Sequence, residues 1–283
     1  MIYLTTNLNY IILITLLIYQ LFYNQFILCD NGYDLNGMNC GIQAPFNYIV
    51  GGLTLSTMEF PFLVLIKFMA STVCGGTIIN NQWIITAAHC FNKRLNRISD
   101  FTVHAGSIHL YDGEVYRMEF ALVHPKFSML KMTYDIALAK LTTPINFGPN
   151  IGTICLPSVQ RQEPSGTITA AGWGRLKAHM AASTVVQKVN LPIISDEECA
   201  HKYQRLGVTI WNSQMCTWLK GHDTCEGDSG GPAFQFSGGR AHLLGIVSFG
   251  MECADANPGV YTQVSYYLDW ITTMLHQYGT NYL

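Results

Sequence analysis

The chain reads Gly-Asp-Ser-Gly-Gly-Pro at residues 227–232. Glycine has no Cβ, so a serine among glycines can stand on a tight, exposed turn with its hydroxyl free. The glycines also leave backbone N–H groups accessible, which the stabilisation of an oxyanion requires. Ser229 is therefore a candidate nucleophile, and a glycine-rich β-turn without chemistry is the alternative interpretation.

The residues after Ser229 distinguish two settings for the G-x-S-x-G pattern. In the α/β-hydrolases the serine lies in a strand–turn–helix elbow. Here Pro232 and the pair Gly238-Gly239 follow the serine, and glycine and proline are the poorest helix formers. The pattern therefore favours a serine that is not followed by a helix.

A serine nucleophile needs a base, because the pKa of its free hydroxyl is too high for attack at neutral pH. Among nine histidines, His89 has the most distinctive frame, since it stands in Thr86-Ala87-Ala88-His89-Cys90 directly after the apolar run Trp83–Ile85. A histidine beside a disulfide cysteine is held rigidly, as a general base must be. A structural histidine at a strand end is the alternative, and we interpret the other eight as surface or packing residues.

The base in turn needs an orienting carboxylate. Asp135 is the one acid inside the apolar, strand-like run Tyr134–Leu138. A buried carboxylate is costly unless it is paired, so we expect Asp135 to contact an imidazole. An acid that faces solvent from an edge strand is the alternative.

Short apolar or alternating runs, separated by Gly, Asn, Asp and Pro, recur from Ile49 onward and favour an all-β barrel or sandwich. Examples are residues 62–68, 76–79, 83–85, 166–171, 185–194, 242–249 and 260–264. Convincing helical spacing occurs only at the end, where we predict a helix over Ser265–Gln277. The 283 residues carry 12% charged side chains and a formal net charge of −2, which predicts a folded body and no charge-driven attraction to nucleic acid.

The first residues differ from the rest, because no Lys or Arg precedes Lys67 and the run Ile11–Leu28 is mostly apolar. We predict that residues 1–28 are a secretory signal peptide. A signal anchor that stays in the membrane is the alternative, although three amide side chains interrupt the run and disfavour a span. Residues 29–48 are short and polar and are predicted to form a linker or pro-segment.

Nine cysteines without a C-x-x-C pair favour disulfides in an oxidising compartment over a structural zinc site. They are Cys29, Cys40, Cys74, Cys90, Cys155, Cys199, Cys216, Cys225 and Cys253. If removal of the leader takes Cys29 with it, eight cysteines remain and four bridges are possible. If the cut falls before Cys29, this residue is a spare thiol.

Six segments in a fixed order resemble the chymotrypsin/trypsin-type serine proteases. They are Ile49-Val50-Gly51-Gly52, Thr86–Cys90, Asp135–Leu138, Gly172-Trp173-Gly174, Gly227–Pro232 and Pro258-Gly259-Val260-Tyr261. The resemblance extends from about Cys40 to the end of the chain. It implies an all-β fold of two six-stranded antiparallel β-barrels, with a trypsin-like protease domain over residues 49–283 and the site in the cleft between the barrels.

The resemblance also implies the roles of the candidate site residues. Ser229 would attack the scissile carbonyl and form an acyl-enzyme, and His89 would take the serine proton and return it to the leaving amine. Asp135 would hold the imidazole tautomer, and the N–H groups of Gly227 and Ser229 would bind the oxyanion.

Asp223, six residues before Ser229, would form the floor of the specificity pocket. In this family an acid there resembles the trypsin subgroup, which selects Arg or Lys. The walls of the pocket would be Ser248, Phe249, Gly250 and Gly259. Phe249 stands in place of the usual Trp, and Glu252 stands in place of the usual Gly, so both bear on the strength of that preference.

Activation by cleavage between Tyr48 and Ile49 is a further implication of the resemblance. The new N-terminus at Ile49 would turn inward, and its ammonium would pair with Asp228. Because Tyr48 stands where Arg or Lys is usual, we expect an activating protease that cuts after aromatic residues. The implied disulfides are Cys40–Cys155, Cys74–Cys90, Cys199–Cys216 and Cys225–Cys253.

The partners implied are protein or peptide substrates, the activating protease and protein protease inhibitors, with the chain as a secreted, extracellular monomer. No nucleic acid and no cofactor is predicted. Some relatives hold calcium in a loop, but Ser107 replaces the first acid of that loop, so no metal is predicted. Two alternatives remain: a catalytically silent homologue that serves as a binding or scaffold protein, and a membrane-anchored protease.

Overall fold

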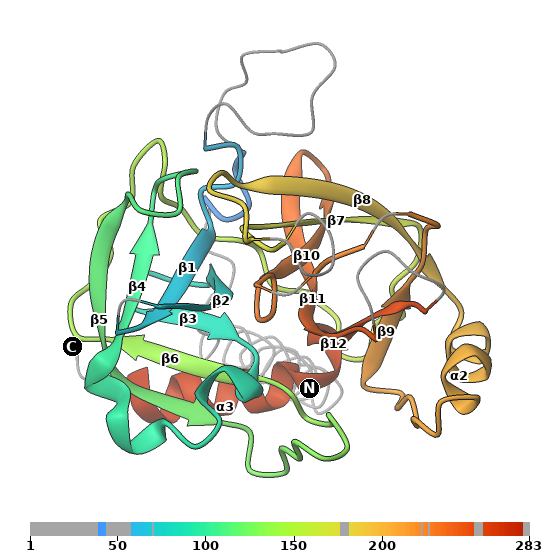
Figure 1. Cartoon of the computed structure of the whole chain (residues 1–283). Coiled ribbons are helices and arrows are strands. Elements are labelled where there is room, and N and C mark those ends of the chain that lie inside the picture. Colours follow the sequence, from blue (N-terminus) through green and yellow to red (C-terminus); the bar gives the residue numbers. More distant parts are fainter. Residues whose placement is uncertain are drawn as a thin grey trace, which may run out of the picture. The chain divides into compact units, whose positions relative to one another are not determined.

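Two closed, six-stranded antiparallel barrels form the body of the protein (Figure 1). This computed structural model describes residues 39–43, 58–69, 71–175, 181–221, 223–225, 227–251 and 257–279. All of them belong to one unit, Asn36–Leu283. The barrels confirm the predicted fold class.

The first barrel has the strand order β1-β2-β3-β6-β5-β4 and the second has the order β10-β11-β12-β9-β8-β7. The strands of the first barrel are β1 (Leu63–Phe68), β2 (Ser71–Ile78), β3 (Trp83–Thr86), β4 (Phe101–Ala105), β5 (Glu114–Val123) and β6 (Ala137–Leu141). Those of the second are β7 (Thr167–Gly172), β8 (Gln187–Ile194), β9 (Gln214–Thr217), β10 (Pro232–Ser237), β11 (Arg240–Phe249) and β12 (Gly259–Gln263).

The sequence of each strand explains how it fills its barrel. Along β4, buried and half-buried residues alternate, as the two-residue period of a strand requires. All of β3 is buried. Position 76 in β2 has room only for glycine, since a Cβ there would come within 2.9 Å of the Ile84 side chain and 3.0 Å of the Val64 side chain. In the second barrel every strand contributes to the core, through Ile168, Leu191, Met215, Ala233, Val247 and Tyr261.

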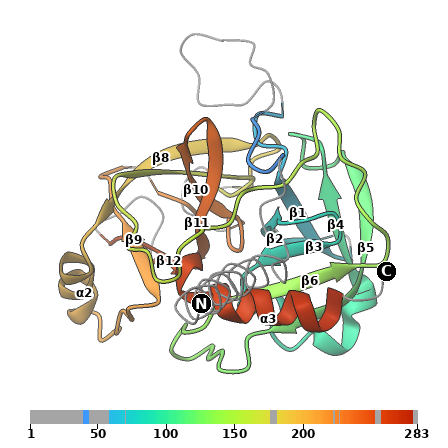
Figure 2. The ribbon, with the colours of Figure 1, turned by 180° about the vertical axis from the view of Figure 1, so that it is seen from behind.

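The C-terminal helix begins later than predicted. Val264–Tyr267 form a 3-10 turn, η3, and the α-helix α3 covers Leu268–Gly279. Although α3 follows the second barrel in the chain, it packs beside the first (Figure 2). Its Tyr278 lies 5.7 Å from the ring of Phe120 in β5. The helix therefore helps to hold the two barrels together.

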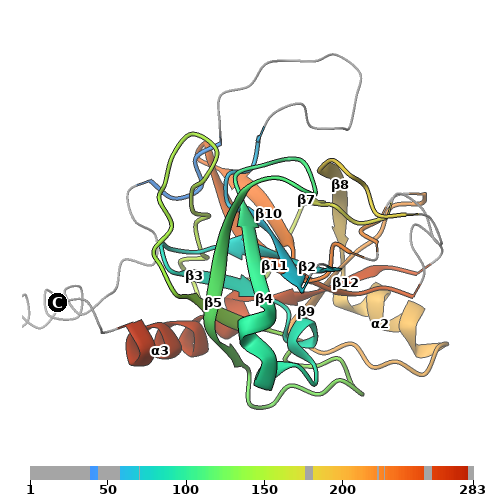
Figure 3. The same cartoon turned by 60° about the vertical axis from the view of Figure 1, so that its left-hand side comes forward.

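The helix α2 (Asp196–Gln204) was not predicted from the sequence. It buries only Cys199 and Tyr203, so its apolar face is too narrow to give a periodic pattern. The available indication was Ser195 followed three residues later by Glu198, which is a capping-box pattern, and the Glu198 amide does donate to Ser195 Oγ at 3.1 Å. Figure 3 shows α2 on the outer side of the second barrel, beyond β9 and β12.

No helix in the described ranges combines the length and the apolar character needed to cross a membrane. The predicted leader, residues 1–28, and most of the predicted pro-segment, residues 29–48, lie outside those ranges. Both assignments stay predictions.

Candidate active site

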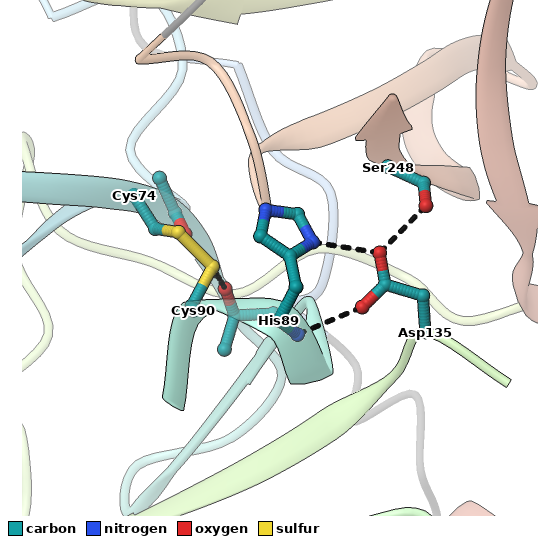
Figure 4. Close-up of a disulfide and its surroundings, with 7 residues drawn as sticks. Cys74, His89, Cys90, Asp135 and Ser248 are labelled. Carbon is teal, nitrogen blue, oxygen red and sulfur yellow. Dashed lines mark hydrogen bonds and ion pairs between the residues drawn. A yellow bond between two sulfur atoms is a disulfide. The ribbon is translucent and has the colours of Figure 1, made fainter. Parts of the chain in front are cut away.

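His89 lies at the end of the first barrel's strand β3, in the 3-10 turn η1 (Ala88–Phe91). Its neighbour Cys90 forms a disulfide with Cys74 of β2, and Thr86 Oγ1 donates to the Gly75 carbonyl at 2.8 Å. These two links fix the turn to the barrel, as Figure 4 shows for the disulfide. The histidine is thereby held in place, which a general base requires.

Asp135 lies two residues before β6, not inside a strand as we predicted. It is 1% exposed. Its Oδ2 lies 2.7 Å from His89 Nδ1, and its Oδ1 accepts the His89 backbone N–H at 2.9 Å. The carboxylate is thus buried but paired, as expected, and the contact assigns the proton of the neutral imidazole to Nδ1. The ring atom Nε2 is then the one able to accept a proton.

The Ser248 side chain is turned toward Asp135, and the place of this residue in the pocket wall stays a prediction. Its hydroxyl donates to Asp135 Oδ2 at 2.6 Å, and the residue is 2% exposed. The register between β11 and β12 shifts between Val247 and Phe249, and such a bulge re-aims a side chain. Ser248 therefore orients the carboxylate (Figure 4). The indication in the sequence was a hydroxyl in an otherwise apolar run.

Thr262, in β12, also contacts Asp135. Its Oγ1 donates to the Asp135 backbone carbonyl at 2.8 Å. The second barrel thus supplies one hydroxyl to the side chain and another to the backbone of an acid that belongs to the first barrel. No pattern in the sequence indicated this contact, because 127 residues separate the two.

The turn that carries Ser229 lies against the first barrel. The amide of Gly75 donates to the Ser229 carbonyl at 2.8 Å. Gly230 has φ +80°, and a Cβ there would come within 2.2 Å of Thr86 Oγ1, so only glycine lets the turn approach so closely. Since Gly75 and Thr86 also hold the His89 turn, the structure brings the serine turn to the histidine. No hydrogen bond joins Ser229 to His89 among the described atoms.

The amides of this turn differ in their partners. Those of Asp228, Gly230 and Gly231 donate to backbone carbonyls at 2.7–3.0 Å. Within the described part of the chain, the amides of Gly227 and Ser229 donate to no backbone carbonyl. The two amides predicted to bind an oxyanion are therefore the ones that the turn itself does not use.

Asp223, Gly250 and Gly259 lie together, as predicted. A Cβ on Gly259 would come within 2.6 Å of Asp223 Oδ1, and one on Gly250 within 3.6 Å of Asp223 Oδ2. Glycine at both positions leaves room beside the carboxylate. Phe249 lies against Tyr203, with ring centroids 5.9 Å apart, and burial raises the pKa of Tyr203, with a smaller contribution from Asp223.

Asp228 borders a cavity of about 160 Å³ that also touches Gly172, Gly174 and Asp223. Its carboxylate accepts the amides of Gly174 at 2.8 Å and Cys225 at 3.1 Å. A Cβ on either of Gly172 and Gly174 would come within 2.2 Å of a carboxylate oxygen. Burial raises the pKa of Asp228 to about 6, and the two amides offset part of that effect.

The disulfides Cys40–Cys155, Cys74–Cys90 and Cys199–Cys216 are confirmed. Cys225 is disulfide-bonded as well. The predictions for Tyr48, Ile49, Glu252 and Cys253 concern residues outside the described ranges. Cys74, Cys90 and His89 place ligand-type atoms within 4.8 Å of one another, but the two sulfurs are bonded to each other and are not thiolate ligands.

His124 packs beside the catalytic candidates, against Tyr134. Their rings are stacked, with centroids 4.9 Å apart. The Nδ1 atom of His124 accepts the Lys126 amide at 3.2 Å, which requires that nitrogen to be unprotonated. Burial, and secondarily Lys126, lowers the pKa of His124 to about 4. The histidine is therefore neutral at pH 7.

We expect acid to destabilise the fold through His124. Because its folded pKa is lowered from 6.5 to about 4, its contribution is complete above pH 6.5 and is lost as the pH falls toward 4, by roughly 3 kcal/mol. Urea unfolding at pH 7, 5.5 and 4 measures this loss. His124→Phe should flatten the pH dependence, whereas His109→Phe, at an exposed position, should not. Parallel curves for the wild type and His124→Phe would contradict the assignment.

The chain is similar in sequence to known serine proteases. The trypsin family model matches residues 49–271. Over 253 residues the chain is 36% identical to the serine proteinase stubble of Drosophila melanogaster, covering 82% of this chain and 32% of the relative.

Two further relatives are similar over comparable lengths. Transmembrane protease serine 5 of Homo sapiens is 33% identical over 86% of this chain and 55% of its own length. The CLIP domain-containing serine protease B4 of Anopheles gambiae is 34% identical over 82% of this chain and 71% of its own length. The chain thus spans about a third and about half of the first two relatives. With the family model matched across both barrels, the chain belongs to the trypsin family of serine proteases.

Proposed function

We propose that this protein is a serine endopeptidase in which His89, Asp135 and Ser229 act as the catalytic triad. The observation that carries the proposal is the buried contact of 2.7 Å between His89 Nδ1 and Asp135 Oδ2. It leaves Nε2 of a neutral imidazole as the proton acceptor, beside a serine turn that glycine alone allows to lie so close. Membership of the trypsin family supports the same reaction.

The reaction follows from these positions. Ser229 Oγ attacks the scissile carbonyl carbon while His89 Nε2 takes the hydroxyl proton. The amides of Gly227 and Ser229 stabilise the oxyanion. The C–N bond then breaks, His89 passes its proton to the leaving amine, and an acyl ester on Ser229 remains. His89 then takes a proton from water, whose oxygen attacks the ester carbon. The bond from that carbon to Ser229 Oγ breaks, His89 returns the proton to Ser229 Oγ, and the new carboxylate leaves.

We propose a preference for Arg or Lys at the cleaved bond. The support is Asp223, whose carboxylate lies beside Gly250 and Gly259 with space where side chains would otherwise be. A cation that enters this space would pair with the carboxylate, and such a pair discriminates strongly against neutral side chains. Phe249 and Gly250 would flank the substrate chain.

We also propose that the protein is made as a zymogen and activated between Tyr48 and Ile49. The support is the Asp228 carboxylate, which borders a cavity and has a raised pKa, because burial of a carboxylate is costly unless a cation pairs with it, and no ion pair of Asp228 stands among the described residues. The 160 Å³ cavity beside it could receive the ammonium of a new N-terminus at Ile49. Residues 29–48 would be the pro-segment, and the activating enzyme would cut after an aromatic residue.

Gln43 and Glu59, which flank the proposed cleavage site, are hydrogen-bonded to each other. Gln43 Nε2 donates to Glu59 Oε1 at 2.9 Å, and Lys188 Nζ lies 2.7 Å from Glu59 Oε2. Lys188 also borders the Asp228 cavity. Gln43 precedes the proposed cleavage site and Glu59 follows it, so both ends of the segment start near the cavity that would receive the new N-terminus.

The expected location is extracellular, with residues 1–28 as a signal peptide. The disulfides in the described barrels support an oxidising compartment. A signal anchor is the alternative for this leader, and release of the protein into the medium distinguishes the two. The partners would be protein or peptide substrates, the activating protease and protein inhibitors.

Hydrolysis of paired chromogenic peptides tests the proposal. The protein is cut at Tyr48–Ile49, and N-terminal sequencing checks for Ile-Val-Gly-Gly. We expect kcat/KM for Arg or Lys peptides to exceed that for Phe or Tyr peptides by about 10²–10³-fold. Asp223→Ser should abolish this ratio, whereas Asp112→Ser, on the surface, should preserve it. A preference for Phe or Tyr would overturn the specificity, and no hydrolysis of any peptide would overturn the endopeptidase itself.

A further inference from the structure

A second and larger cavity, of about 470 Å³, lies away from the serine turn. We call it the side cavity. Most of the residues that line it belong to the segment that joins β5 to β6 and to the segment that joins α2 to β9. Tyr266 of η3 forms a third wall. None of the triad residues borders it, so the proposed reaction leaves this cavity without a role.

The walls of the side cavity are tied together by Gln214, the first residue of β9. Its Nε2 donates to the Met132 carbonyl at 2.8 Å, and its Oε1 accepts the Trp211 amide at 2.9 Å. The side chain thus bridges the two segments, and the residue is 2% exposed. The Ser128 amide closes its own loop by donating to the Thr133 carbonyl at 3.1 Å. The cavity is therefore a preformed site.

Lysine and aromatic side chains stand among the residues that line the side cavity. Lys126 and Lys131 border it and are both exposed. Tyr134, Trp211 and Tyr266 supply aromatic walls, and the Lys126 ammonium lies 5.8 Å from the centre of the Tyr134 ring. No carboxylate stands among the described residues that line it. Although the chain carries a net charge of −2, this cavity is positive and suits an anion.

Apolar side chains adjoin the two lysines. Leu130, next to Lys131 in the loop, is 94% exposed, and Met129 is 49% exposed. Trp211 is 41% exposed on the opposite wall. An occupant that buries these groups needs apolar or aromatic side chains as well as negative charge. Exposed apolar groups rimmed by polar ones mark interaction sites.

We propose that the side cavity docks an acidic, aromatic-containing segment of a protein substrate, outside the residues that hold the cleaved bond. Carboxylates of that segment would pair with Lys126 and Lys131, and its aromatic side chains would lie against Tyr134 and Trp211. The inference rests on the proposed endopeptidase function. A peptide fits better than a sulfated polysaccharide, because the described lining holds two lysines beside three aromatic rings and four neutral polar residues, and Met129 and Leu130 are exposed next to them.

The position of the cavity connects docking to catalysis. Tyr134, one of its walls, directly precedes Asp135 in the chain. A substrate segment held there would increase the local concentration of the rest of the substrate at the active site. We therefore expect the cavity to raise the rate of cleavage of acidic proteins and to leave the rate of hydrolysis of short peptides unchanged.

Binding of a labelled acetyl-Glu-Phe-Glu-Tyr-Glu-amide to the activated protein, followed by fluorescence anisotropy, tests the site directly. Lys131→Glu should weaken binding by about tenfold, and Lys126→Glu should do the same. Arg117→Glu makes the same change in net charge on β5 and should alter binding less than twofold. Undetectable binding, or equal weakening by Arg117→Glu, would overturn the proposal.

A kinetic arm separates this inference from the proposed function. The unlabelled pentapeptide should slow the cleavage of casein, an acidic protein, and leave the hydrolysis of a short Arg chromogenic peptide unchanged. Failure to cleave the short peptide would count against the endopeptidase, whatever the pentapeptide binds. Equal inhibition of both substrates would overturn a separate docking site. Tighter binding of dextran sulfate, with the same dependence on Lys131, would replace the peptide by a polysaccharide.

Discussion

Ser229→Ala should lower kcat on a chromogenic peptide by a factor on the order of 10⁶, which is the size of effect known for removal of the nucleophile from a Ser-His-Asp triad. In the proposed mechanism the hydroxyl supplies the attacking oxygen, and neither His89 nor Asp135 can replace it. The turn itself should persist, because its backbone is fixed by the Gly75 amide and by the packing of Gly230 against Thr86. Steady-state kinetics on the activated protein measures the loss.

Two controls make the result on Ser229 decisive. Ser237→Ala, at the exposed end of β10, should retain the wild-type rate. An active-site phosphonate should label the wild type in a ratio of about one to one and should not label Ser229→Ala. Unaltered kcat in a correctly folded Ser229→Ala protein would refute the mechanism. Absence of labelling in the wild type would favour the silent homologue.

Asp135→Asn should lower kcat at neutral pH by about 10⁴-fold, the magnitude known for this change in the triad generally. Asp135 faces three donors, namely the His89 imidazole, the His89 amide and the Ser248 hydroxyl. An amide that turns its NH₂ group to the imidazole would stabilise the wrong tautomer, with the proton on Nε2. His89 then could not accept the proton of Ser229.

The same three contacts predict that further variants lower kcat by smaller amounts than Asp135→Asn does. Ser248→Ala removes one donor to the carboxylate and should lower kcat by about 10-fold to 100-fold. Asp100→Asn changes a surface acid that is paired with Arg97 and should stay within twofold of wild type. If Asp135→Asn lowers kcat by a smaller factor than Ser248→Ala does, the carboxylate does not hold the imidazole in the way that the geometry indicates.

The pairing of His89 with Asp135 could be predicted from the sequence, because each residue stood in a distinctive local frame. The orientation of Ser248 could not, since it depends on a bulge in the pairing of β11 with β12. A hydroxyl in an otherwise apolar run singled out Ser248, but the register that aims its side chain is a property of the two strands together. The same holds for Thr262, whose contact with Asp135 joins the two barrels.

The boundaries of elements were also set by tertiary structure. Asp135 looked like part of a strand because its neighbours are apolar, yet Tyr134 has φ 53° and the strand begins only at Ala137. The C-terminal helix looked continuous from Ser265, but Val264–Tyr267 form a tighter 3-10 turn. Periodicity reports which face is buried, and it does not report how tightly the backbone is wound.

The bridge between Cys40 and Cys155 has a consequence for how activation is detected. The Gly41 amide donates to the Thr153 carbonyl, and the Arg240 guanidinium donates to the Cys40 carbonyl, so the peptide before the cut is held covalently and by hydrogen bonds. Hydrolysis after Tyr48 would add one water molecule to the protein and release no fragment. Zymogen and enzyme would therefore run as one band on a non-reducing gel. Only after reduction with a thiol would a short light chain separate from the rest of the protein.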